Sequence, residues 1–327
     1  MPLAIQMDTY GGPGVLHSAE IALAPLQPGE VRFKVIAAAV NRADIEIRSG
    51  KWPIMAPSPF PYTPGLEALG DVVAVGEMVE SVKSGERVIT MMQRLGGIHG
   101  IRPGGYQEYV TVLADSVAIV PSHLDPLAME ALGLAAVTAC EGLKRLHLSP
   151  GQRLVVHGAT GGVGSAATLL ALAEGVEVIA TTSSAGKDEH LRSLGVTEIV
   201  HLREQSLTRQ IGARSVDAVF ETLGQRTFAD SVAALKRGGR LVLIGAASGE
   251  TLSLVAWDLL QDLILTGYSS ENLTGDDLRQ DISSLSRLLE QGKISAPPNQ
   301  RYPLHEVARV HELMEQGKLT GRALLIP

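Results

Sequence analysis

The sequence predicts an α/β protein with two parts, namely a small barrel or sandwich of short strands and a parallel, doubly wound sheet. Three observations lead to this prediction. Short apolar stretches separated by glycine and proline fill the first third of the chain. From Arg153 onward, strand patterns alternate with helical patterns. The glycine-rich segment His157–Gly164 joins the first strand of this alternation to its first helix.

The N-terminal part is predicted to be β structure. Residues 30–35 alternate between polar and apolar side chains, which is the period of a half-buried strand. Turn residues at 84–86, 103–105 and 121 separate the other apolar stretches. The other expected strands are 70–75, 87–92, 109–112 and 117–120.

The rest of the chain has the pattern of an α/β domain followed by a short tail. Apolar residues recur at helical spacing from Pro126 to His147, and Ser149–Gly151 ends this helix. Strands and helices then alternate at the spacing of a parallel, doubly wound sheet. The expected strands are 153–157, 176–182, 198–202, 216–221, 240–244 and 263–268, and the expected helices are 162–174, 186–194, 204–212, 225–236 and 253–261. In the tail we expect a helix from residue 276, a proline-rich loop at 296–298, a helix at 305–316 and a strand at 323–326.

The composition excludes several classes of protein. The 327 residues are 45% hydrophobic and 19% charged, which is ordinary for a soluble globular protein of about two domains. The net charge is −7 without a long basic stretch, so a nucleic-acid surface is not expected. No apolar run reaches the ~18 residues of a membrane helix, and the first residues lack a secretion signal. The single cysteine, Cys140, excludes a disulfide framework and a multi-thiolate zinc site. We therefore expect a cytoplasmic protein without nucleic-acid or membrane partners.

The glycine-rich segment has the pattern of a dinucleotide-binding loop. Ala159, Gly161 and Gly164 occupy the three positions of a G-x-G-x-x-G pattern, with alanine in the first. The second position lets the main chain approach a diphosphate, and the third lets the helix pack closely on the strand. N–H groups at the start of the helix then face the phosphates. The alternative is a glycine-rich packing turn that binds no nucleotide.

The residues after the second strand of this region favour NADPH over NADH. An NAD site has an acidic residue there, about 20 residues beyond the loop, to hold the ribose 2′-hydroxyl. Here Ala180–Lys187 contains no acid. The hydroxyls of Thr182, Ser183 and Ser184 would donate to a 2′-phosphate, and Lys187 would supply a positive charge. The alternative for Lys187 is a solvated lysine early in a helix.

Six segments together resemble the medium-chain dehydrogenase/reductase superfamily, and within it the zinc-free quinone oxidoreductase branch, which includes the zeta-crystallins. Leu154–Gly164 closely resembles the cofactor loop of that superfamily. The enoyl reductase domains of polyketide synthases are close relatives. The resemblance covers essentially the whole chain. The other five segments are 40–44, 62–67 (followed by Gly70 and Gly76), 85–88, 104–109 and 317–322.

The resemblance implies a GroES-like β-barrel catalytic domain and a Rossmann nucleotide-binding domain. The first would comprise residues 1–123 and 269–327, and the second would comprise residues 124–268. It also implies an active site between the domains and a homodimer formed through the nucleotide-domain sheet, with a tetramer as the alternative. The expected cofactor-binding residues are Asn41, Thr138, Thr160, Gly161, Gly162, Val163, Gly164, Thr182, Ser183, Lys187, Leu223, Gly245, Ala246 and Arg322.

The resemblance also argues against a metal. Zinc alcohol dehydrogenases of this superfamily place ligands where this chain has Asn41, Leu66 and Leu134, and none of these is a usual zinc ligand. His99 lies in a glycine-rich loop and is expected to be exposed. Four further histidines have no motif around them and are expected at the surface or in the core: His17, His123, His190 and His311.

The implied chemistry is hydride delivery from NADPH to an electrophilic small molecule, either a quinone or an α,β-unsaturated carbonyl compound. A hydrogen-bond donor would stabilise the developing oxyanion. Asn41 matches the position beside the nicotinamide in relatives, although an Asx turn with Asp44 is the alternative for this residue. Tyr62 is a candidate donor, and solvent protonation is the alternative. Tyr106 and Tyr268 are further candidates, and each is equally compatible with a packed aromatic residue.

Two other functions stay open from the sequence. Relatives often carry tyrosines where this chain has Glu46 and Trp52. This difference is compatible with an NADPH-binding protein that has a sensor or structural role and no turnover. The relation to enoyl reductases allows an acyl thioester as substrate. Trp52 and Tyr62 would form a pocket rim within Gly50–Pro64, and the glycine-rich segment Gln93–Gly105 is expected to be mobile and to shape the pocket.

Overall fold

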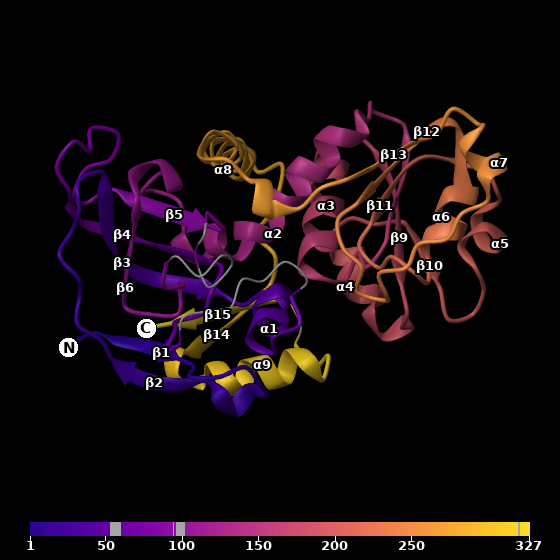
Figure 1. Ribbon diagram of the computed structural model, residues 1–327. Helices are drawn as coiled ribbons and strands as arrows, with labels where there is room; N and C mark the ends of the chain where they lie inside the picture. The colour runs from indigo at the N-terminus through magenta and orange to yellow at the C-terminus, as the bar shows by residue number, and fades with distance from the viewer. Residues whose placement is uncertain (53–59, 94, 96–101, 320) are drawn as a thin grey trace. The chain divides into compact units, whose positions relative to one another are not determined.

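The computed structural model describes residues 1–52, 60–93, 95, 102–319 and 321–327. The chain divides into two compact units (Figure 1). Unit 1 contains Met1–Leu134, Leu273–Gly292 and Ala296–Pro327, and unit 2 contains Ala135–Asn272 and Lys293–Ser295. The sequence predicts boundaries at 123/124 and 268/269, whereas the two compact units change at Leu134/Ala135 and at Asn272/Leu273. His99, residues 53–59 of the expected rim, and residues 94 and 96–101 of the expected mobile loop lie outside the described residues.

Unit 1 is built mainly on antiparallel strands, as its alternating pattern predicts, and β14 and β15 pair in parallel. A seven-stranded sheet has the order β14-β15-β3-β4-β5-β7, with β6 pairing with β3, and β1 and β2 form a separate hairpin-like pair. The long strand β3 is central because it pairs with β4, β6 and β15. The strands are β1 (Leu3–Gln6), β2 (His17–Glu20), β3 (Glu30–Ala39), β4 (Glu67–Val75), β5 (Arg87–Met91), β6 (Tyr109–Leu113), β7 (Ala118–Ile119), β14 (Asn299–Pro303) and β15 (Arg322–Ile326), and the helices are α1 (Arg42–Arg48), α8 (Gly275–Glu290) and α9 (Val307–Glu315).

Unit 2 is a doubly wound sheet with helices on both faces (Figure 1). Its six strands are all parallel in the order β10-β9-β8-β11-β12-β13. Because β8 lies in the middle, the chain winds first toward β10 and then reverses toward β13. The strands are β8 (Arg153–Val156), β9 (Glu177–Thr182), β10 (Glu198–His201), β11 (Val216–Glu221), β12 (Leu235–Leu243) and β13 (Ile264–Gly267), and the helices are α3 (Gly162–Ala173), α4 (Asp188–Ser193), α5 (Leu207–Ile211), α6 (Phe228–Ala234) and α7 (Ala256–Leu259).

The core of unit 2 explains why its strands are nearly continuous apolar runs. Val155, Val219 and Leu241 come from three adjacent strands and are fully buried. Each such side chain stabilises the fold by about 1.5–3 kcal/mol relative to an exposed one. A parallel sheet covered by helices on both faces buries both sides of each strand, so the apolar pattern does not alternate.

The helix α2 (Pro126–Leu146) runs from unit 1 into unit 2. It is long and apolar enough to span a membrane by composition, but most of it is buried inside the protein. The helix is interrupted at Gly133, whose φ is +35° and ψ is −139°. It is therefore a core helix with an interruption at Gly133. The main chain at this interruption is hydrogen-bonded to Glu67 of unit 1.

Several segments differ from the sequence-based expectations. The helix expected to reach residue 236 ends at Ala234, because Leu235 pairs with Val216 as the start of β12. The helix expected at 253–261 is shorter in the structure, where it comprises Ala256–Leu259. The sequence patterns did not indicate four elements, namely β1, β2, α1 and β14, which are short or largely polar.

Candidate functional site

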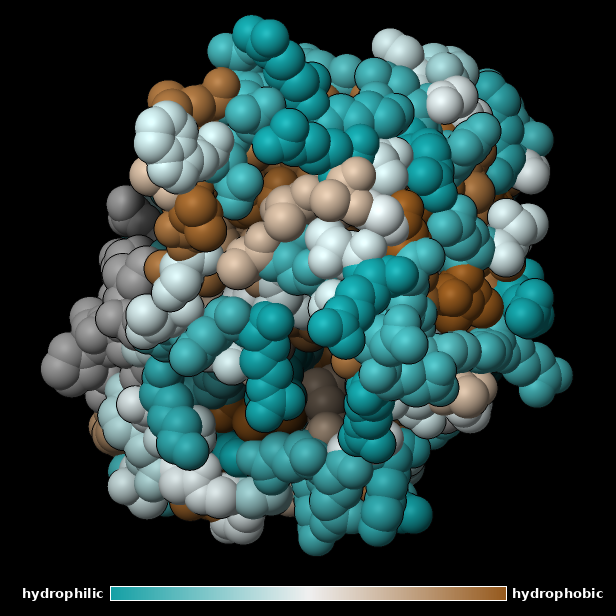
Figure 2. All heavy atoms as spheres, turned by 90° about the vertical axis from the view of Figure 1, so that its right-hand side faces the viewer, coloured by the Kyte–Doolittle hydropathy of each residue, from teal (hydrophilic) through white to brown (hydrophobic). Residues whose placement is uncertain are grey.

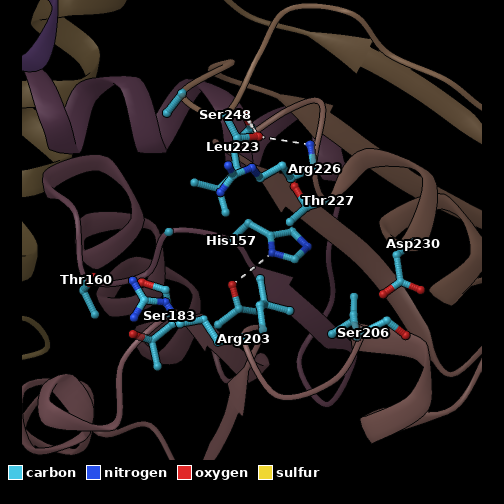
Figure 3. A pocket seen from close by; sticks show the side chains of 16 residues that line it. His157, Thr160, Ser183, Arg203, Ser206, Leu223, Arg226, Thr227, Asp230 and Ser248 are labelled. Atoms are coloured by element: carbon cyan, nitrogen blue, oxygen red, sulfur yellow. Dashed lines mark hydrogen bonds between the residues drawn. The ribbon is translucent and has the colours of Figure 1, made fainter.

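A cavity of about 790 Å³ lies beyond the carboxyl ends of the strands of unit 2. Residues that follow β8 and β11 line it together, and the winding direction reverses between these two neighbouring strands. Ligands of doubly wound sheets bind at such a reversal. The lining residues are His157, Gly158, Thr160, Thr181, Thr182, Ser183, Leu202, Arg203, Ser206, Leu207, Leu223, Arg226, Thr227, Asp230, Ala247 and Ser248 (Figure 3).

The glycine-rich loop brings the start of α3 against the end of β8. A Cβ atom on Gly164 would lie 2.2 Å from the Gly158 carbonyl oxygen, so only glycine permits this approach. A Cβ atom on Gly161 would meet only the same oxygen, at 3.3 Å. Gly161 precedes α3 and is exposed, which leaves the N–H groups of the first turn accessible. The loop therefore has the form that a diphosphate requires.

A buried hydrogen-bond network supports the floor of the cavity. His157 is fully buried, with Nδ1 2.9 Å from Thr181 Oγ1 and Nε2 2.9 Å from Ser231 Oγ. The Ser231 hydroxyl donates to Glu221 Oε2 at 2.8 Å. Ser231 then accepts from the Nε2–H of His157, and Nδ1 accepts from Thr181. Burial lowers the pKa of His157, which keeps the ring neutral.

The same network shapes the loop after β11. Glu221 Oε1 accepts the main-chain N–H groups of Leu223, at 2.8 Å, and Gly224, at 3.2 Å. Thr222 donates its hydroxyl to the His157 carbonyl at 2.8 Å. Because Leu223 lines the cavity, these bonds set the position of the cavity wall. The Ser231–His157 contact is completely buried and lacks the carboxylate on Nδ1 that a hydrolytic triad needs, so it is a positioning network.

The end of β9 carries the hydroxyl groups expected beside a 2′-phosphate. Thr182 and Ser183 line the cavity. The Thr182 hydroxyl contacts the main chain of Ser184, with Oγ1 3.2 Å from the Ser184 nitrogen, so it is partly engaged. Lys187 is exposed in the turn Ala185–Lys187 and does not line the cavity. Asp188, the first acid after β9, contacts the His201 ring, with Oδ1 2.9 Å from Nε2.

In unit 1, the expected residues Asn41 and Arg322 meet at a buried carboxylate. Arg322 Nη2 lies 2.7 Å from Glu67 Oε1, and the same oxygen accepts Asn41 Nδ2 at 2.8 Å. Arg322 Nη1 also donates to Asn41 Oδ1 at 3.1 Å. The Asn41 amide is therefore held at both ends, which sets its orientation.

Glu67 also explains the break in α2. Its Oε2 accepts the Leu134 main-chain N–H at 2.6 Å. A Cβ atom on Gly133 would lie 2.1 Å from that oxygen, and the positive φ of this residue favours glycine. The carboxylate thus occupies the gap in the helix. Nearby, Glu130 accepts the Ala39 N–H through Oε1 at 2.7 Å, and burial raises the pKa of Glu130 well above its usual value.

A second group of hydrogen-bonded polar residues in unit 1 surrounds the Asp44 carboxylate. This carboxylate accepts the main-chain N–H groups of Asn41, at 2.8 Å, and Leu66, at 3.1 Å. Asn41 precedes α1, and the Asp44 carboxylate caps this helix by accepting the Asn41 main-chain N–H, whereas the Asn41 side chain contacts Glu67 and Arg322. Tyr106 contacts Asp44 and lies 3.4 Å from Nε2 of the buried His311. Burial raises the pKa of Asp44 to about 7.

Tyr62 is also in unit 1 and is buried. Its main chain exchanges two hydrogen bonds of 3.0 Å with Met7. Burial raises the pKa of its hydroxyl, so the group stays neutral. Tyr268, in unit 2, packs its ring against the Arg145 guanidinium at 4.3 Å. Of the other histidines without a motif, His17 and His123 are exposed and His190 is half-buried.

Comparisons with known proteins agree with these features. The model of the alcohol dehydrogenase GroES-like domain matches residues 27–122, and the zinc-binding dehydrogenase model matches residues 194–325. Quinone oxidoreductase of Sus scrofa is 30% identical over 333 residues, which cover 99% of this chain and 97% of that protein. The chain belongs to the quinone oxidoreductase branch of the medium-chain dehydrogenase/reductase superfamily.

Solved structures of this superfamily confirm the fold class of a GroES-like domain with a Rossmann domain. Escherichia coli quinone oxidoreductase complexed with NADPH has a TM-score of 0.88 and 29% identity, and the match covers 99% of this chain and 100% of that one. A mycobacterial protein complexed with NADPH has a TM-score of 0.86 and 29% identity, with 100% of both chains covered.

The residues at the zinc positions of the superfamily do not suit a metal. Asn41 is bonded to Glu67 and Arg322, and Leu66 and Leu134 are buried hydrocarbon side chains. Within the described ranges, no group of three or more His, Cys, Asp or Glu side chains is placed to hold a metal ion. In this protein, the positive charge next to Glu67 is the Arg322 guanidinium.

The cofactor-binding residues expected from the sequence of this chain fall into three groups. Thr160, Thr182, Ser183 and Leu223 line the cavity. Asn41 and Arg322 contact one another in unit 1. The remaining expected residues do not line the cavity: Thr138, Gly161, Gly162, Val163, Gly164, Lys187, Gly245 and Ala246.

Sequence reasoning did not assign several cavity residues. Arg203 follows β10 and Arg226 precedes α6, and the glycine pattern contains no information about either position. Asp230 lines the cavity from within α6. Recognising that β10 is the neighbour of β9 would have indicated Arg203, because parallel neighbours end at the same edge of a sheet.

Proposed function

We propose that this chain is an NADPH-dependent, zinc-independent oxidoreductase that transfers a hydride to a quinone or an α,β-unsaturated carbonyl compound. The observation that carries the proposal is the cavity at the strand-order reversal of unit 2, bordered by the glycine-rich loop. The relatives are named quinone oxidoreductases, and similar structures were solved with NADPH. These names support both the coenzyme and the substrate class.

The polarity of the cavity supports NADPH as the coenzyme. The end of β9 offers the Ser183 hydroxyl and no carboxylate, whereas an NAD site has an acid at this place. Asp230 is the only acid lining the cavity in the described part of the chain, and it accepts the Thr208 N–H at 3.2 Å. Two arginines, Arg203 and Arg226, line the same cavity. The balance of charge favours a ligand with an additional phosphate.

The residues of this chain would bind and orient the reactants, while bound NADPH supplies the hydride. The loop before α3 would hold the diphosphate through its N–H groups. Asn41 would present a fixed amide beside the nicotinamide because Glu67 and Arg322 hold both of its ends. Neither Asn41 nor the buried Tyr62 offers a free donor directed at solvent, which favours solvent as the source of the proton.

We also propose that the protein is a homodimer formed through β13. This strand is the last in the sheet order, so one of its edges has no neighbour among the described strands. Next to it, Val255 is 59% exposed, Trp257 74%, Leu260 64% and Ile264 42%. Exposed apolar side chains beside an open strand edge favour pairing with a second copy. Figure 2, which faces unit 2, shows hydrophobic groups and a hollow on a largely hydrophilic surface.

The proposed compartment is the cytoplasm. The chain has a single cysteine, which is half-buried. Disulfide-dependent folding is therefore not required, and this is consistent with a reducing compartment. Fractionation of cells that produce the protein would test this, and recovery from the membrane or secreted fraction would contradict it.

The decisive experiment is a screen for coenzyme oxidation. Purified protein is mixed with NADPH and, in separate reactions, with a panel of quinones, enals and 2-enoyl thioesters, and the NADPH absorbance is followed. We expect oxidation with quinones or enals, and weaker oxidation with NADH. Activity should survive dialysis against a metal chelator. Loss of activity with the chelator would contradict zinc independence.

The same screen separates the alternatives. Turnover of thioesters alone would identify an enoyl reductase. Tight NADPH binding without oxidation across the panel would favour the binding protein without turnover. Equal use of NADH and NADPH would contradict the coenzyme assignment.

A further inference from the structure

The position of β10 places an arginine at the part of the cavity where the two coenzymes differ. β10 runs parallel to β9, with His201 opposite Thr182. The Leu202 N–H extends this pairing by donating to the Thr182 carbonyl at 3.0 Å. Ser183 directly follows Thr182, and Arg203 lies two residues after His201, so both emerge at the same edge of the sheet and line the cavity. In a doubly wound sheet, the residue after the second strand faces the adenosine ribose.

The Arg203 side chain is available to a ligand. Arg203 lines the cavity and is exposed, and it makes no hydrogen bond or ion pair within the part of the chain that the structure describes. In Figure 3, the nitrogens of its guanidinium lie on the side of the cavity where Ser183 and Thr160 are found. The hydroxyl and the guanidinium thus converge from two neighbouring strands.

The nearby acids do not neutralise this arginine. Asp188 is paired with His201 at 2.9 Å. Asp230 lies on the opposite side of the cavity in Figure 3, where both of its oxygens contact Thr208. The positive charge of Arg203 is therefore directed at the cavity and not at a carboxylate of the described chain.

The second arginine of the cavity has a different position. Arg226 donates its main-chain N–H to Ser248 Oγ at 3.0 Å. In Figure 3 it lies near Leu223 and Ser248, away from Ser183. Arg226 is thus suited to a part of the ligand that NADH and NADPH share.

We propose that Arg203 binds the 2′-phosphate of NADPH, together with the Ser183 hydroxyl, and thereby sets the preference over NADH. This inference rests on the proposed function only for the identity of the coenzyme. A planar guanidinium forms two parallel hydrogen bonds to a phosphate, whereas a lysine ammonium acts as a point charge. Lys187 lies outside the cavity lining, so it is not expected to set the preference.

The test measures ligand binding without turnover. Adenosine 2′,5′-bisphosphate and 5′-AMP differ only in the 2′-phosphate, so the ratio of their dissociation constants isolates that group. Calorimetry is performed with the wild type and with Arg203→Gln, Arg203→Lys, Lys187→Gln and Arg226→Gln. Arg203 is exposed, so its variants should keep the wild-type thermal midpoint.

We expect the wild type to prefer the bisphosphate, and Arg203→Gln to weaken bisphosphate binding by about 10- to 100-fold, as for loss of a charge-assisted pair. Binding of 5′-AMP should not change. Arg203→Lys should keep part of the preference, and its salt dependence should resemble that of the wild type, since the charge remains. Lys187→Gln and Arg226→Gln should both keep the wild-type ratio.

Three results would overturn the inference. They are an unchanged ratio in Arg203→Gln, an equal loss of both ligands in that variant, and loss of the preference in Lys187→Gln or Arg226→Gln instead. A wild type that does not prefer the bisphosphate would also overturn it. If the ratio depends on Arg203 but no substrate oxidises NADPH, the inference stands and the proposed reaction fails.

Discussion

Glu67 and Arg322 form a 2.7 Å ion pair although they are 255 residues apart in the sequence. Glu67 is fully buried and Arg322 is 7% exposed. The pair also holds the Asn41 amide, and Glu67 accepts the Leu134 N–H in the break of α2. One carboxylate therefore connects the strand β4, the strand β15, the residue before α1 and the interruption of α2.

Removing one member of this pair should be strongly destabilising. Arg322→Met would leave the Glu67 carboxylate buried without its cation, and such a loss costs about 3–5 kcal/mol. Glu67→Gln combined with Arg322→Met should cost less than the sum of the single changes, because no uncompensated charge remains. Urea unfolding of the three variants measures this.

The matched control is the exposed pair formed by Arg237 and Asp262 at 2.7 Å. Their side chains are 77% and 64% exposed, so Arg237→Gln should leave the unfolding midpoint unchanged. If Arg322→Met is no less stable than this control, the buried pair has no structural role.

His311 and Asp44 should give opposing dependences of stability on pH. Burial and the nearby Arg48 lower the pKa of His311 to about 3, from a usual value of 6.5. Between these values only the unfolded chain binds the proton, so the contribution of His311 is full above about pH 6.5 and is lost toward pH 3. Burial raises the pKa of Asp44 to about 7, from 3.8. Its contribution is full below about pH 4 and is lost as the pH rises toward 7.

Single substitutions should reveal each contribution. His311→Gln should make stability fall more steeply than in the wild type as the pH rises from about 4.5 to 6.5, because only Asp44 remains. Asp44→Asn should make it fall more steeply as the pH drops over the same range. Chemical unfolding across that range is the measurement, and two variants with the wild-type profile would show that neither group titrates as described.

Two glycines of the phosphate loop should separate binding from folding. The Cβ added by Gly161→Ala meets a single atom at 3.3 Å, so the variant should fold normally and lose NADPH affinity by about 10-fold or more. The Cβ added by Gly164→Ala would lie 2.2 Å from the Gly158 oxygen, and this overpacking should cost about 1–3 kcal/mol. Thermal melting and NADPH titration are performed on both variants. Normal NADPH affinity in Gly161→Ala would contradict diphosphate binding by this loop.

The proposed dimer should depend on the free edge of β13. Ile264→Lys places a charge on this edge and should convert the protein to a monomer in light scattering, while NADPH binding is retained. Val73→Lys is the control, since Val73 is 46% exposed on a strand of unit 1. A dimer that survives Ile264→Lys and dissociates with Val73→Lys would place the interface elsewhere.

Elements with a strong local pattern were predictable from the sequence. The strand expected at 216–221 is found as Val216–Glu221, and the helix expected from Gly162 begins there. Short or polar elements such as α1 and β14 were missed because few apolar residues define their period. Leu235 was assigned to a helix, but its pairing with Val216 makes it part of a strand.

The sequence by itself determined the doubly wound sheet, the glycine-rich loop at its first turn and the lack of an acid after the second strand. These features depend on residues close together in the chain, where periodicity and backbone freedom act directly. Only the tertiary structure decided which distant side chains come together, such as Glu67 with Arg322 in an ion pair, and Ser183 with Arg203 in the lining of one cavity. Such contacts depend on strand order and burial, and a buried charge stays where another part of the chain supplies its partner.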